Sequence, residues 1–329
     1  MIVHLAIDGV MEGALGLGLD VVDTAARLQR AGRSSAPRST RALQQQVVSH
    51  DGAPVPSVQR RALSVEGRFD PKTLGRGDVV VLPGVFATKD SSLDRLFARA
   101  DVRKVIELLP RAAARGALIA ASCSATFFLA AAGLLDGRQA TTTWWLMPFF
   151  ARRFPQVDLR SDRMVVDAGP CLTAGSAFAH ADLMLAVVAR VGSPTLSNLA
   201  ARYLVLDARP SQAKYMVMEH VHGFDPMLRG LEDFVTANLE RQVSLAELAR
   251  AAATSPRTLA RRLAERLQVT PHRFVQRLRV AHAVHLLEST HESVEAIAAR
   301  VGYQDPAAFR RVFRRAVGTG PGSYRARSG

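Results

Sequence analysis

Short, continuously apolar segments alternate with amphipathic segments along the first two hundred residues. The apolar segments are rich in β-branched residues and end at glycine, proline or serine, which is typical of buried strands. The segments between them repeat apolar residues every three or four positions, which predicts helices. The predicted strands are residues 2–7, 44–49, 78–84, 116–122 and 171–175, and the clearest predicted helices are residues 93–116 and 177–192.

Strands that alternate with helices form βαβ units, in which helices cover both faces of a mostly parallel sheet. We therefore predict an α/β domain with a flavodoxin-like, three-layer architecture over residues 1–205. The alternation is lost over residues 206–226, and we place the interdomain linker there. Only helical periodicity remains over residues 227–329, which predicts an all-α C-terminal domain.

One uncharged stretch has the length of a membrane-spanning helix. Residues 117–135 carry no charge. However, Ser122, Cys123, Ser124 and Thr126 lie in its middle, and the mean hydropathy of the chain is only +0.06. We therefore expect a buried strand followed by a buried helix, and no membrane partner.

The cysteine content and the first residues indicate a reducing compartment. Two cysteines are too few for a disulfide framework or for a zinc or iron–sulfur site. The N-terminus lacks the basic segment of a secretory signal and soon reaches Asp8 and Glu12. These features predict a cytoplasmic protein.

Positive charge is concentrated in the C-terminal third of the chain. The net charge is +14, and residues 241–329 hold 16 arginines against six acidic residues, which is +10 of that total. Such a basic domain favours a polyanionic partner, and nucleic acid is the first candidate.

Two segments of the C-terminal domain resemble each other. Residues 244–265 and 293–315 each begin with a serine that can cap a helix, followed by apolar residues at matching spacing. After a short turn, a second helix begins with a capping residue and a proline, at residues 255–256 and 305–306. A capped helix, a tight turn and a second helix with a basic face are the parts of a helix-turn-helix motif.

The second helix of each motif carries the candidate DNA contacts. Such a helix enters the major groove, where arginine donates two hydrogen bonds to guanine or neutralises phosphates. The amphipathic helix of residues 271–289 would hold the two copies at a fixed separation, so that one chain could read two successive grooves. The alternative is a set of solvated surface arginines, which two matching copies disfavour. We predict contacts from Arg257, Thr258, Arg261, Arg262, Ala307, Arg310, Arg311 and Arg314, and the strongest candidates are Arg257, Arg261, Arg310 and Arg311.

Residues 227–329 are similar to the AraC/XylS family of bacterial transcription regulators. The resemblance lies in P-x-x-F followed by R-L-R-x-x-x-A-x-x-L-L (271–287), in I-A-x-x-V-G-Y-x-D-x-x-x-F-x-R-x-F (297–313) and in G-T-G-P-x-S-Y-R (318–325). It covers nearly the whole domain, with small departures at Leu263 and Gly320. The resemblance implies binding to double-stranded promoter or operator DNA, and RNA polymerase as a further partner.

Residues 120–145 suggest a nucleophile elbow, in which a strand turns sharply at Cys123 into a helix. A helix N-terminus lowers the pKa of a thiol, so this cysteine could be a nucleophile. The alternative is a small thiol packed in a core, where free cysteine is usually found. From the residue types alone, we favour the buried thiol.

The same region resembles the PfpI-type branch of the class I glutamine amidotransferase-like superfamily. The resemblance lies in L-P-G (82–84), A-x-C-x-A (121–125) and A-G-L-L-D-G-R-x-A-T-T (132–142), and it spans about residues 1–205. Two further stretches, S-x-D-G-x-x-V (49–55) and D-x-R-x-x-Q (207–212), match the AraC-type regulators that carry this domain.

The residues that would assist catalysis are missing from this pattern. Ser124 and Thr143 stand where relatives have histidine, and an approximate alignment places Ala14 at the acidic position, two residues from Glu12. A cysteine without a nearby base cannot perform acyl transfer, although His180 could approach it in the fold. We therefore predict no catalytic residue, but a sensor and dimerisation domain with a ligand pocket near the elbow. The predicted pocket residues are Glu12, Gly84, Cys123, Ser124, Thr143 and Trp144.

Other candidate sites are weaker. His220 and His222 could bind a metal, but no third ligand presents itself, so we predict neither a metal nor a cofactor. Trp144 and Trp145 could recognise a cationic ligand, although such residues more often lie in a core or an interface. The glycines of residues 13–18 lack the register of a dinucleotide-binding loop.

These features together predict a homodimeric transcription regulator whose N-terminal domain binds an unknown small-molecule effector. Such coupling requires the effector to bind two states of the protein with different affinity. Two other interpretations remain open. A cysteine-dependent hydrolase with an appended DNA-binding domain is disfavoured by Ser124 and Thr143, and a nonspecific nucleoid-binding protein is disfavoured by the paired motifs.

Overall fold

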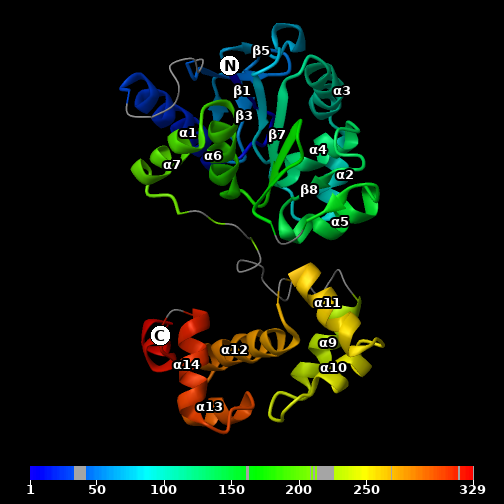
Figure 1. Ribbon diagram of the computed structural model, residues 1–329, viewed down its shortest axis with the longest axis vertical. Coiled ribbons are helices and arrows are strands. Elements are labelled where there is room, and N and C mark those ends of the chain that lie inside the picture. The colour runs from blue at the N-terminus through cyan, green and yellow to red at the C-terminus, as the bar shows by residue number, and fades with distance from the viewer. Residues whose placement is uncertain are drawn as a thin grey trace. The chain divides into compact units, whose positions relative to one another are not determined.

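A computed structural model describes residues 1–32, 42–160, 163–207, 209, 212, 226–267, 269–317 and 319–328. The chain divides into two compact units, Met1–Met216 and Val217–Gly329. The first contains a sheet with helices, and the described part of the second contains only helices (Figure 1). Most of the predicted linker lies outside the described residues, and so do His220 and His222.

A seven-stranded sheet forms the centre of the first unit (Figure 1). Its order is β10-β11-β7-β6-β1-β2-β5, and all neighbouring strands are parallel except β10, which is antiparallel to β11. The strands are β1 (Ile2–Leu5), β2 (Gln45–Ser49), β5 (Gly67–Arg68), β6 (Val79–Leu82), β7 (Leu118–Ser122), β10 (Val165–Asp167) and β11 (Cys171–Ala174).

All five predicted strands are present in this sheet, whereas β5 and β10 were not predicted. These two strands have two and three residues, and so short a strand leaves no detectable alternation of apolar and polar positions. The same holds for two small separate sheets. They pair β3 (Val55–Pro56) with β4 (Ala62–Leu63), and β8 (Gln139–Ala140) with β9 (Asp158–Leu159).

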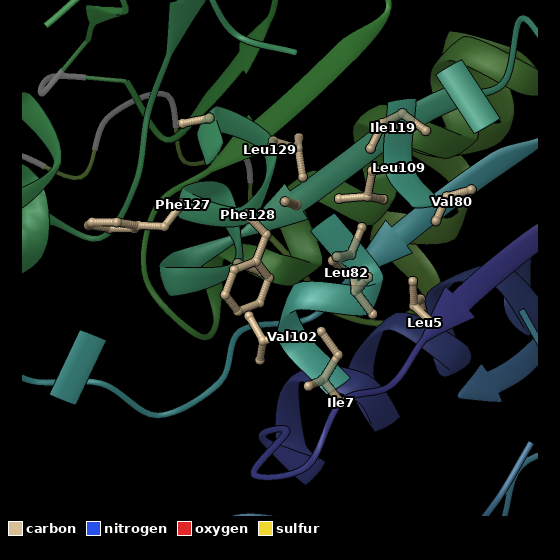
Figure 2. Close-up of a cluster of buried hydrophobic side chains, with 14 of the residues drawn as sticks. Leu5, Ile7, Val80, Leu82, Val102, Leu109, Ile119, Phe127, Phe128 and Leu129 are labelled. Carbon is tan, nitrogen blue, oxygen red and sulfur yellow. The ribbon is translucent and has the colours of Figure 1, made fainter. Parts of the chain in front are cut away.

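Alternate residues of the central strands contribute to the two faces of the sheet. Val80 and Leu82 of β6 belong to a buried cluster with Phe128, part of which is drawn in Figure 2. Val79 and Val81 belong to a second cluster on the opposite face. Because both faces are covered, the central strands are apolar at nearly every position, which is why they read as continuous apolar runs.

Helices on both faces give the three-layer α/β architecture that the sequence predicts. Helices α1, α6 and α7 pack against one another on one face, and α2, α3, α4 and α5 cover the other (Figure 1). The helices of this unit are α1 (Glu12–Arg30), α2 (Asp90–Ala98), α3 (Ala100–Ala114), α4 (Thr126–Ala131), α5 (Met147–Arg153), α6 (Ala179–Val191) and α7 (Pro194–Tyr203).

The prediction of one continuous helix over residues 93–116 is wrong, because the chain forms α2 and α3 there. Arg99 separates them with extended backbone angles (φ −71°, ψ 140°), and its guanidinium donates to the carbonyl of Asp8. The uncharged residues 117–135 form β7, a short 3-10 turn and α4, as predicted. Within the described parts of the chain, no helix is long and apolar enough to cross a membrane.

The described part of the second unit is helical throughout, as the sequence predicts. Helix α12 lies between two helix pairs and packs on both (Figure 1). A buried apolar cluster that includes Phe309 and Phe313 joins it to the C-terminal pair. The helices are α9 (Pro226–Thr236), α10 (Leu245–Ala251), α11 (Pro256–Leu267), α12 (Pro271–Ser289), α13 (Val294–Arg300), α14 (Pro306–Val317) and α15 (Pro321–Ser328).

Two histidines are buried in the first unit, one on β1 and one on α6. Nε2 of His4 lies 3.0 Å from Oε1 of Gln45, and Nδ1 of His180 lies 2.9 Å from Oγ of Ser122. Burial lowers the pKa of His4 to about 4 and that of His180 to about 3, because a buried imidazolium loses its hydration. A Cβ at Gly18 would lie 2.8 Å from Nε2 of His180, so the ring is closely enclosed.

Both histidines are neutral in the folded protein and gain a proton on unfolding below about pH 6.5. The stability that they contribute is therefore present above that pH and is lost as the pH falls toward 4, by about 1.4 kcal/mol per pH unit for each proton. We expect His180→Gln to reduce the slope of the free energy of unfolding against pH by the contribution of one proton. Urea denaturation of the first unit between pH 7.5 and 5 measures this slope. The half-buried His50 of the same unit provides the control His50→Gln, and an unchanged slope in H180Q would contradict the assignment.

Candidate DNA-binding surface and elbow site

The first helix-turn-helix motif consists of α10 and α11. Ser244 caps α10, because its hydroxyl accepts the backbone N–H of Glu247 (3.2 Å) while the Glu247 carboxylate accepts the backbone N–H of Ser244 (2.8 Å). The turn passes through Ala253, which adopts the left-handed conformation (φ 48°). Ser255 then caps α11 by accepting the backbone N–H of Thr258 (3.2 Å). Local sequence therefore specifies this motif, as predicted.

The second motif, α13 and α14, repeats this construction. The hydroxyl of Ser293 accepts the backbone N–H of Ala296 (3.1 Å) at the start of α13. Gly302 makes the turn with a φ of 79°. The Asp305 carboxylate then accepts the backbone N–H groups of Ala307 (2.8 Å) and Ala308 at the start of α14. The second helix of each motif, α11 or α14, thus begins at a capped position.

The buried residues of α11 and α14 define which face of each helix meets solvent. Leu259 and Leu263 of α11, and Phe309 and Phe313 of α14, are fully buried. A helix turns by about 100° per residue. If the first buried residue of each pair is i, the opposite face therefore holds residues i−2, i+2 and i+5. Those positions are exposed throughout. They are Arg257, Arg261 and Ala264 on α11, and Ala307, Arg311 and Arg314 on α14.

Three predicted contacts lie on the sides of these helices. Arg310 forms an ion pair with Glu295 of α13, and Nη1 of Arg262 lies 3.5 Å from the sulfur of Met227. The hydroxyl of Thr258 is hydrogen bonded to that of Ser255 (2.9 Å). The structure therefore places five of the eight predicted residues on the outer faces and three on the flanks.

Arg279 of α12 is 5% exposed, and no role is predicted for it from the sequence. The sequence does hold a signal for its burial, because Arg279 lies four residues from Val275 and from Ala283, which are both buried. A charged residue on an apolar stripe is rare unless it has buried polar partners.

The elbow at Cys123 has the geometry that the sequence predicts. Cys123 joins β7 to a 3-10 turn and then α4, with a φ of 56°. Its backbone N–H donates to the carbonyl of Gly175 (2.7 Å), and its carbonyl accepts the hydroxyl of Thr142 (2.7 Å). A Cβ at Gly84 would lie 2.7 Å from the Cβ of Cys123, so the second residue after β6 must be a glycine.

The thiol itself is buried and protonated. Cys123 is 3% exposed, and burial raises its pKa to about 11, which outweighs hydrogen bonds from Ser124 and Thr143. The pKa-lowering effect considered for the helix N-terminus is therefore overcome by desolvation. The hydroxyl of Ser124 donates to the carbonyl of Val85 and accepts its N–H (3.0 Å), so this side chain links two strand ends.

The other candidate groups around the elbow are also engaged. His180 is bonded to Ser122, and burial keeps its imidazole neutral. Glu12 accepts hydrogen bonds from Ser57 and, at 3.4 Å, from Arg61. Trp144 and Trp145 are half-buried and stack edge to face at 5.1 Å.

A cavity of about 320 Å³ opens beside the elbow, at the carboxyl ends of β1 and β6. From β1 the chain continues to β2 on one side, and β6 begins the other half of the sheet, so this is the switch point of the topology. Ligands of open α/β sheets bind in such a crevice. The cavity is lined by Asp8, Gly9, Ser57, Val58, Arg60, Val85, Phe86, Ser92, Arg95, Leu96 and Arg99.

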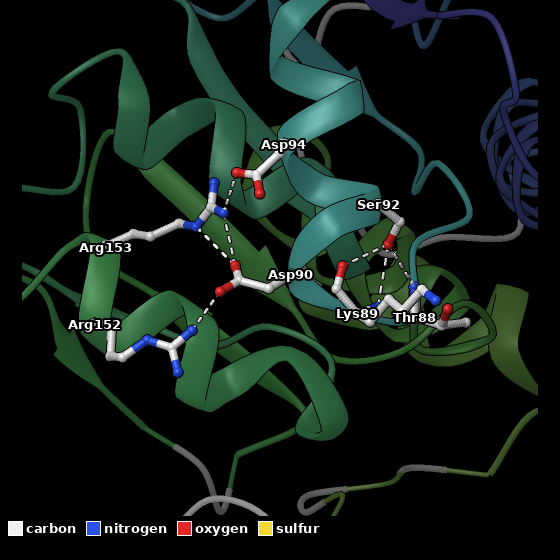
Figure 3. A network of polar contacts seen from close by, with 7 residues as sticks. All are labelled: Thr88, Lys89, Asp90, Ser92, Asp94, Arg152 and Arg153. Atoms are coloured by element: carbon white, nitrogen blue, oxygen red, sulfur yellow. Dashed lines mark hydrogen bonds and ion pairs between the residues drawn. The ribbon is translucent and has the colours of Figure 1, made fainter.

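One wall of this cavity is α2, which a network of ion pairs holds in place (Figure 3). The guanidinium of Arg153 from α5 bonds to Asp90 (2.6 Å) and to Asp94 (2.5 Å), and Arg152 also pairs with Asp90. Ser92 closes the turn before the helix by accepting the backbone N–H of Lys89 (3.1 Å). The lining residues of α2 therefore have a fixed support.

None of the six residues predicted to form a pocket lines this cavity. Cys123, Ser124 and Thr143 are buried in the elbow, Gly84 packs on the thiol, and Glu12 and Trp144 are half-buried. Their neighbours Ser57 and Val85 do line it. In the described parts of the chain, no group of three or more potential ligands could hold a metal ion.

Comparison with known proteins identifies both units. The model of the DJ-1/PfpI family matches residues 19–190, and that of a helix-turn-helix domain matches residues 248–327. The HTH-type transcriptional regulator GlxA of Rhizobium meliloti is 34% identical over 229 residues, which are 67% of this chain and 69% of GlxA. The HTH-type transcriptional regulator CdhR of Pseudomonas aeruginosa is 27% identical over 284 residues, 85% of this chain and 81% of CdhR.

A solved structure supports the fold. A protein from Vibrio parahaemolyticus, described as a candidate transcriptional regulator, superposes with a TM-score of 0.51 at 18% identity, covering 62% of this chain and 97% of that protein. This likeness and the mostly parallel sheet agree on a DJ-1/PfpI-like fold. The chain therefore belongs to the DJ-1/PfpI family and, with its AraC-type helix-turn-helix domain, is a DNA-binding transcription regulator.

Proposed function

We propose that the two motifs read two neighbouring DNA elements, and that the first unit senses a small-molecule effector and forms a homodimer. The observation that carries the DNA-reading part is the pair of capped helices, α11 and α14, whose outer faces present arginines. In this proposal residues 1–205 form the sensor domain, residues 206–226 the linker and residues 227–329 the DNA-binding domain. The protein acts in the cytoplasm, where it meets promoter DNA and RNA polymerase.

Base contacts are assigned to the outer faces rather than the flanks. Arg257, Arg261 and Arg311 lie opposite the buried residues of their helices, where a helix in the major groove faces base edges. Arg310 and Arg262 point along the protein surface toward Glu295 and Met227, which suits contacts to phosphates.

The effector site is assigned to the cavity at the switch point. Three arginines, Arg60, Arg95 and Arg99, border it together with the single acid Asp8. Asp8 lies 3.8 Å from both Arg60 and Arg99, and Asp101 also pairs with Arg99, so the positive charge is only partly balanced. This favours an effector with an acidic group.

The elbow is assigned a structural role in place of catalysis. A thiol with a pKa of about 11 is almost fully protonated at neutral pH and is a poor nucleophile. The residues that touch it, Ser124 and Thr143, are hydroxyls that do not act as a general base at this pH. The Cys123 side chain thus fills the space beneath Gly84.

The DNA-reading proposal is tested by selecting the full-length protein against a random DNA pool at near-physiological salt. We expect enrichment of two short elements about one helical turn apart. Arg261→Ala or Arg311→Ala should then cost about 1–3 kcal/mol of binding free energy and relax specificity at one position. The flank variant Arg262→Ala is the matched control, and it should weaken all sequences alike and lower the salt slope by about one.

Salt-sensitive binding without any enriched sequence would contradict this proposal and support a nonspecific basic module. Equal loss of specificity in Arg261→Ala and Arg262→Ala would contradict the assignment of base contacts to the outer faces alone.

The non-catalytic elbow is tested by thiol labelling. Cys123 and Cys171 are both buried, and burial raises the pKa of each thiol to about 11. We expect neither to react with a disulfide reagent at pH 8 over the time in which the unfolded chain reacts fully. Rapid labelling of Cys123 alone in the folded protein would show an accessible thiolate and would revive the hydrolase interpretation.

The effector site is tested by thermal unfolding with a panel of small carboxylic acids, amino acids and uncharged analogues. A ligand that binds the folded state raises the melting temperature, by an amount that grows with the ratio of its concentration to its Kd. We expect stabilisation by at least one acidic compound, and loss of this effect in Arg95→Gln but not in the control Arg111→Gln, an exposed arginine paired with Glu107 on α3. Equal stabilisation of both variants would place the ligand elsewhere.

A further inference from the structure

Arg279 lies where the two helix-turn-helix motifs meet. It is on α12, and its guanidinium reaches the segment that precedes the first motif and the turn of the second. Nη2 donates to the carbonyl of Arg241 (2.6 Å), just before the first motif, and Nη1 donates to the carbonyl of Gly302 (3.2 Å), in the turn of the second. The guanidinium carbon also lies 5.7 Å from the centre of the Tyr303 ring.

The turn of the second motif is pressed against the same segment. Gly302 has a φ of 79°, and a Cβ there would lie 2.1 Å from the carbonyl oxygen of Leu239 and 2.7 Å from Nη2 of Arg279. Only a glycine permits this approach. Leu239, Arg241, Arg279, Gly302 and Tyr303 therefore form one contact, which we term the motif junction.

Both motifs pack on α12, so this helix already joins them. The buried cluster around Phe309 and Phe313 draws all its members from residue 280 onward, so it belongs to the second motif and to α12. Beside the junction lies a cavity of about 390 Å³, lined by Leu245 and Leu248 from the first motif and by Asp305 and Ala308 from the second, among others. At the motif junction itself, the described contacts between the two sides include both carbonyl bonds of Arg279.

The energetics of Arg279 suit a geometric role. Among the described residues its polar partners are two carbonyl oxygens and an aromatic ring, and no carboxylate bonds to it. Burial lowers the pKa of Arg279 from its ordinary value, which reflects the cost of desolvating the cation. Its Nε has no partner in the described structure. A buried charge of this kind is a poor way to gain stability, but a planar fork of donors fixes the direction of both carbonyls.

We propose that Arg279 is a positioning residue that fixes the orientation of α11 relative to α14 and so sets the spacing of the two DNA elements that one chain reads. This inference rests on the proposed reading of two elements. Each added base pair rotates the second element by roughly 34° about the duplex axis and moves it by roughly 3.4 Å along that axis. A rigid pair of reading helices therefore accepts one spacing only. With a loose junction the motifs bind as tethered modules, whose avidity depends weakly on spacing.

The test compares the selected DNA site with derivatives that have one base pair inserted or removed between its elements. For the wild-type chain we expect roughly tenfold weaker binding to both derivatives. Arg279→Met keeps the apolar stem but loses both carbonyl bonds, so we expect weaker binding to the selected site and less than about threefold difference among the three spacings. The exposed Arg273→Met on the same helix is the matched control, and it should keep the spacing preference even where its affinity falls.

Two further variants keep the test decisive if Arg279→Met fails to fold. Arg279→Lys retains the charge but cannot bridge both carbonyls, and Gly302→Ala disturbs the same junction from the opposite side. Both should relax the spacing preference, with helix content and melting of the second unit as folding controls. A full spacing preference in folded Arg279 variants would overturn the inference while leaving the reading of two elements in place. A wild-type chain without any spacing preference would overturn both.

Discussion

The close approach of β6 to the turn after β7 determines the chemistry of the first unit. Gly84 packs directly on Cys123, so no space remains around the thiol, and desolvation keeps its proton. Ser124, the residue after the cysteine, is hydrogen bonded to Val85 in the same region. Its side chain therefore connects the two strand ends. The open and charged space at this edge of the sheet is consequently found one loop away, between the ends of β1 and β6.

Arginine has two opposite roles in the second unit. The outer and flanking arginines of α11 and α14 remain hydrated, and ion pairs such as Arg310 with Glu295 are exposed and contribute at most about 1 kcal/mol. Such pairs exchange readily for a phosphate, so the proposed DNA-facing surface can adapt to its partner. Arg279 is buried and bonded to backbone carbonyls, and these bonds have no solvent to replace them. The reading surface is therefore adjustable, while the frame that carries it is fixed.

The sequence predicts the features that depend on local or periodic information. Buried strands are apolar at every position because helices cover both faces, and the caps at Ser244 and Asp305 bond to groups within three residues. The break at Arg99 was missed because it depends on Asp8, which is 91 residues away in the chain. β5 and β10 were missed because they are too short to show a pattern.

The candidate site shows the same division. The outer faces of α11 and α14 follow from helical spacing alone, whereas the elbow residues are recognisable but their burial is not. Whether Cys123 faces a pocket depends on how closely Gly84 packs against it, which no local pattern records. Arg279 stands out on an apolar stripe, but its partners are backbone carbonyls. Because every residue has a backbone carbonyl, the sequence does not identify these partners. Within the second unit this junction restricts relative motion of the two reading helices. An effector bound in the first unit would therefore act on the placement of whole DNA-binding units in the proposed dimer. In that case it changes the affinity for paired sites and leaves the contacts of each chain with its own site unchanged, because coupling requires two states that differ in what they bind.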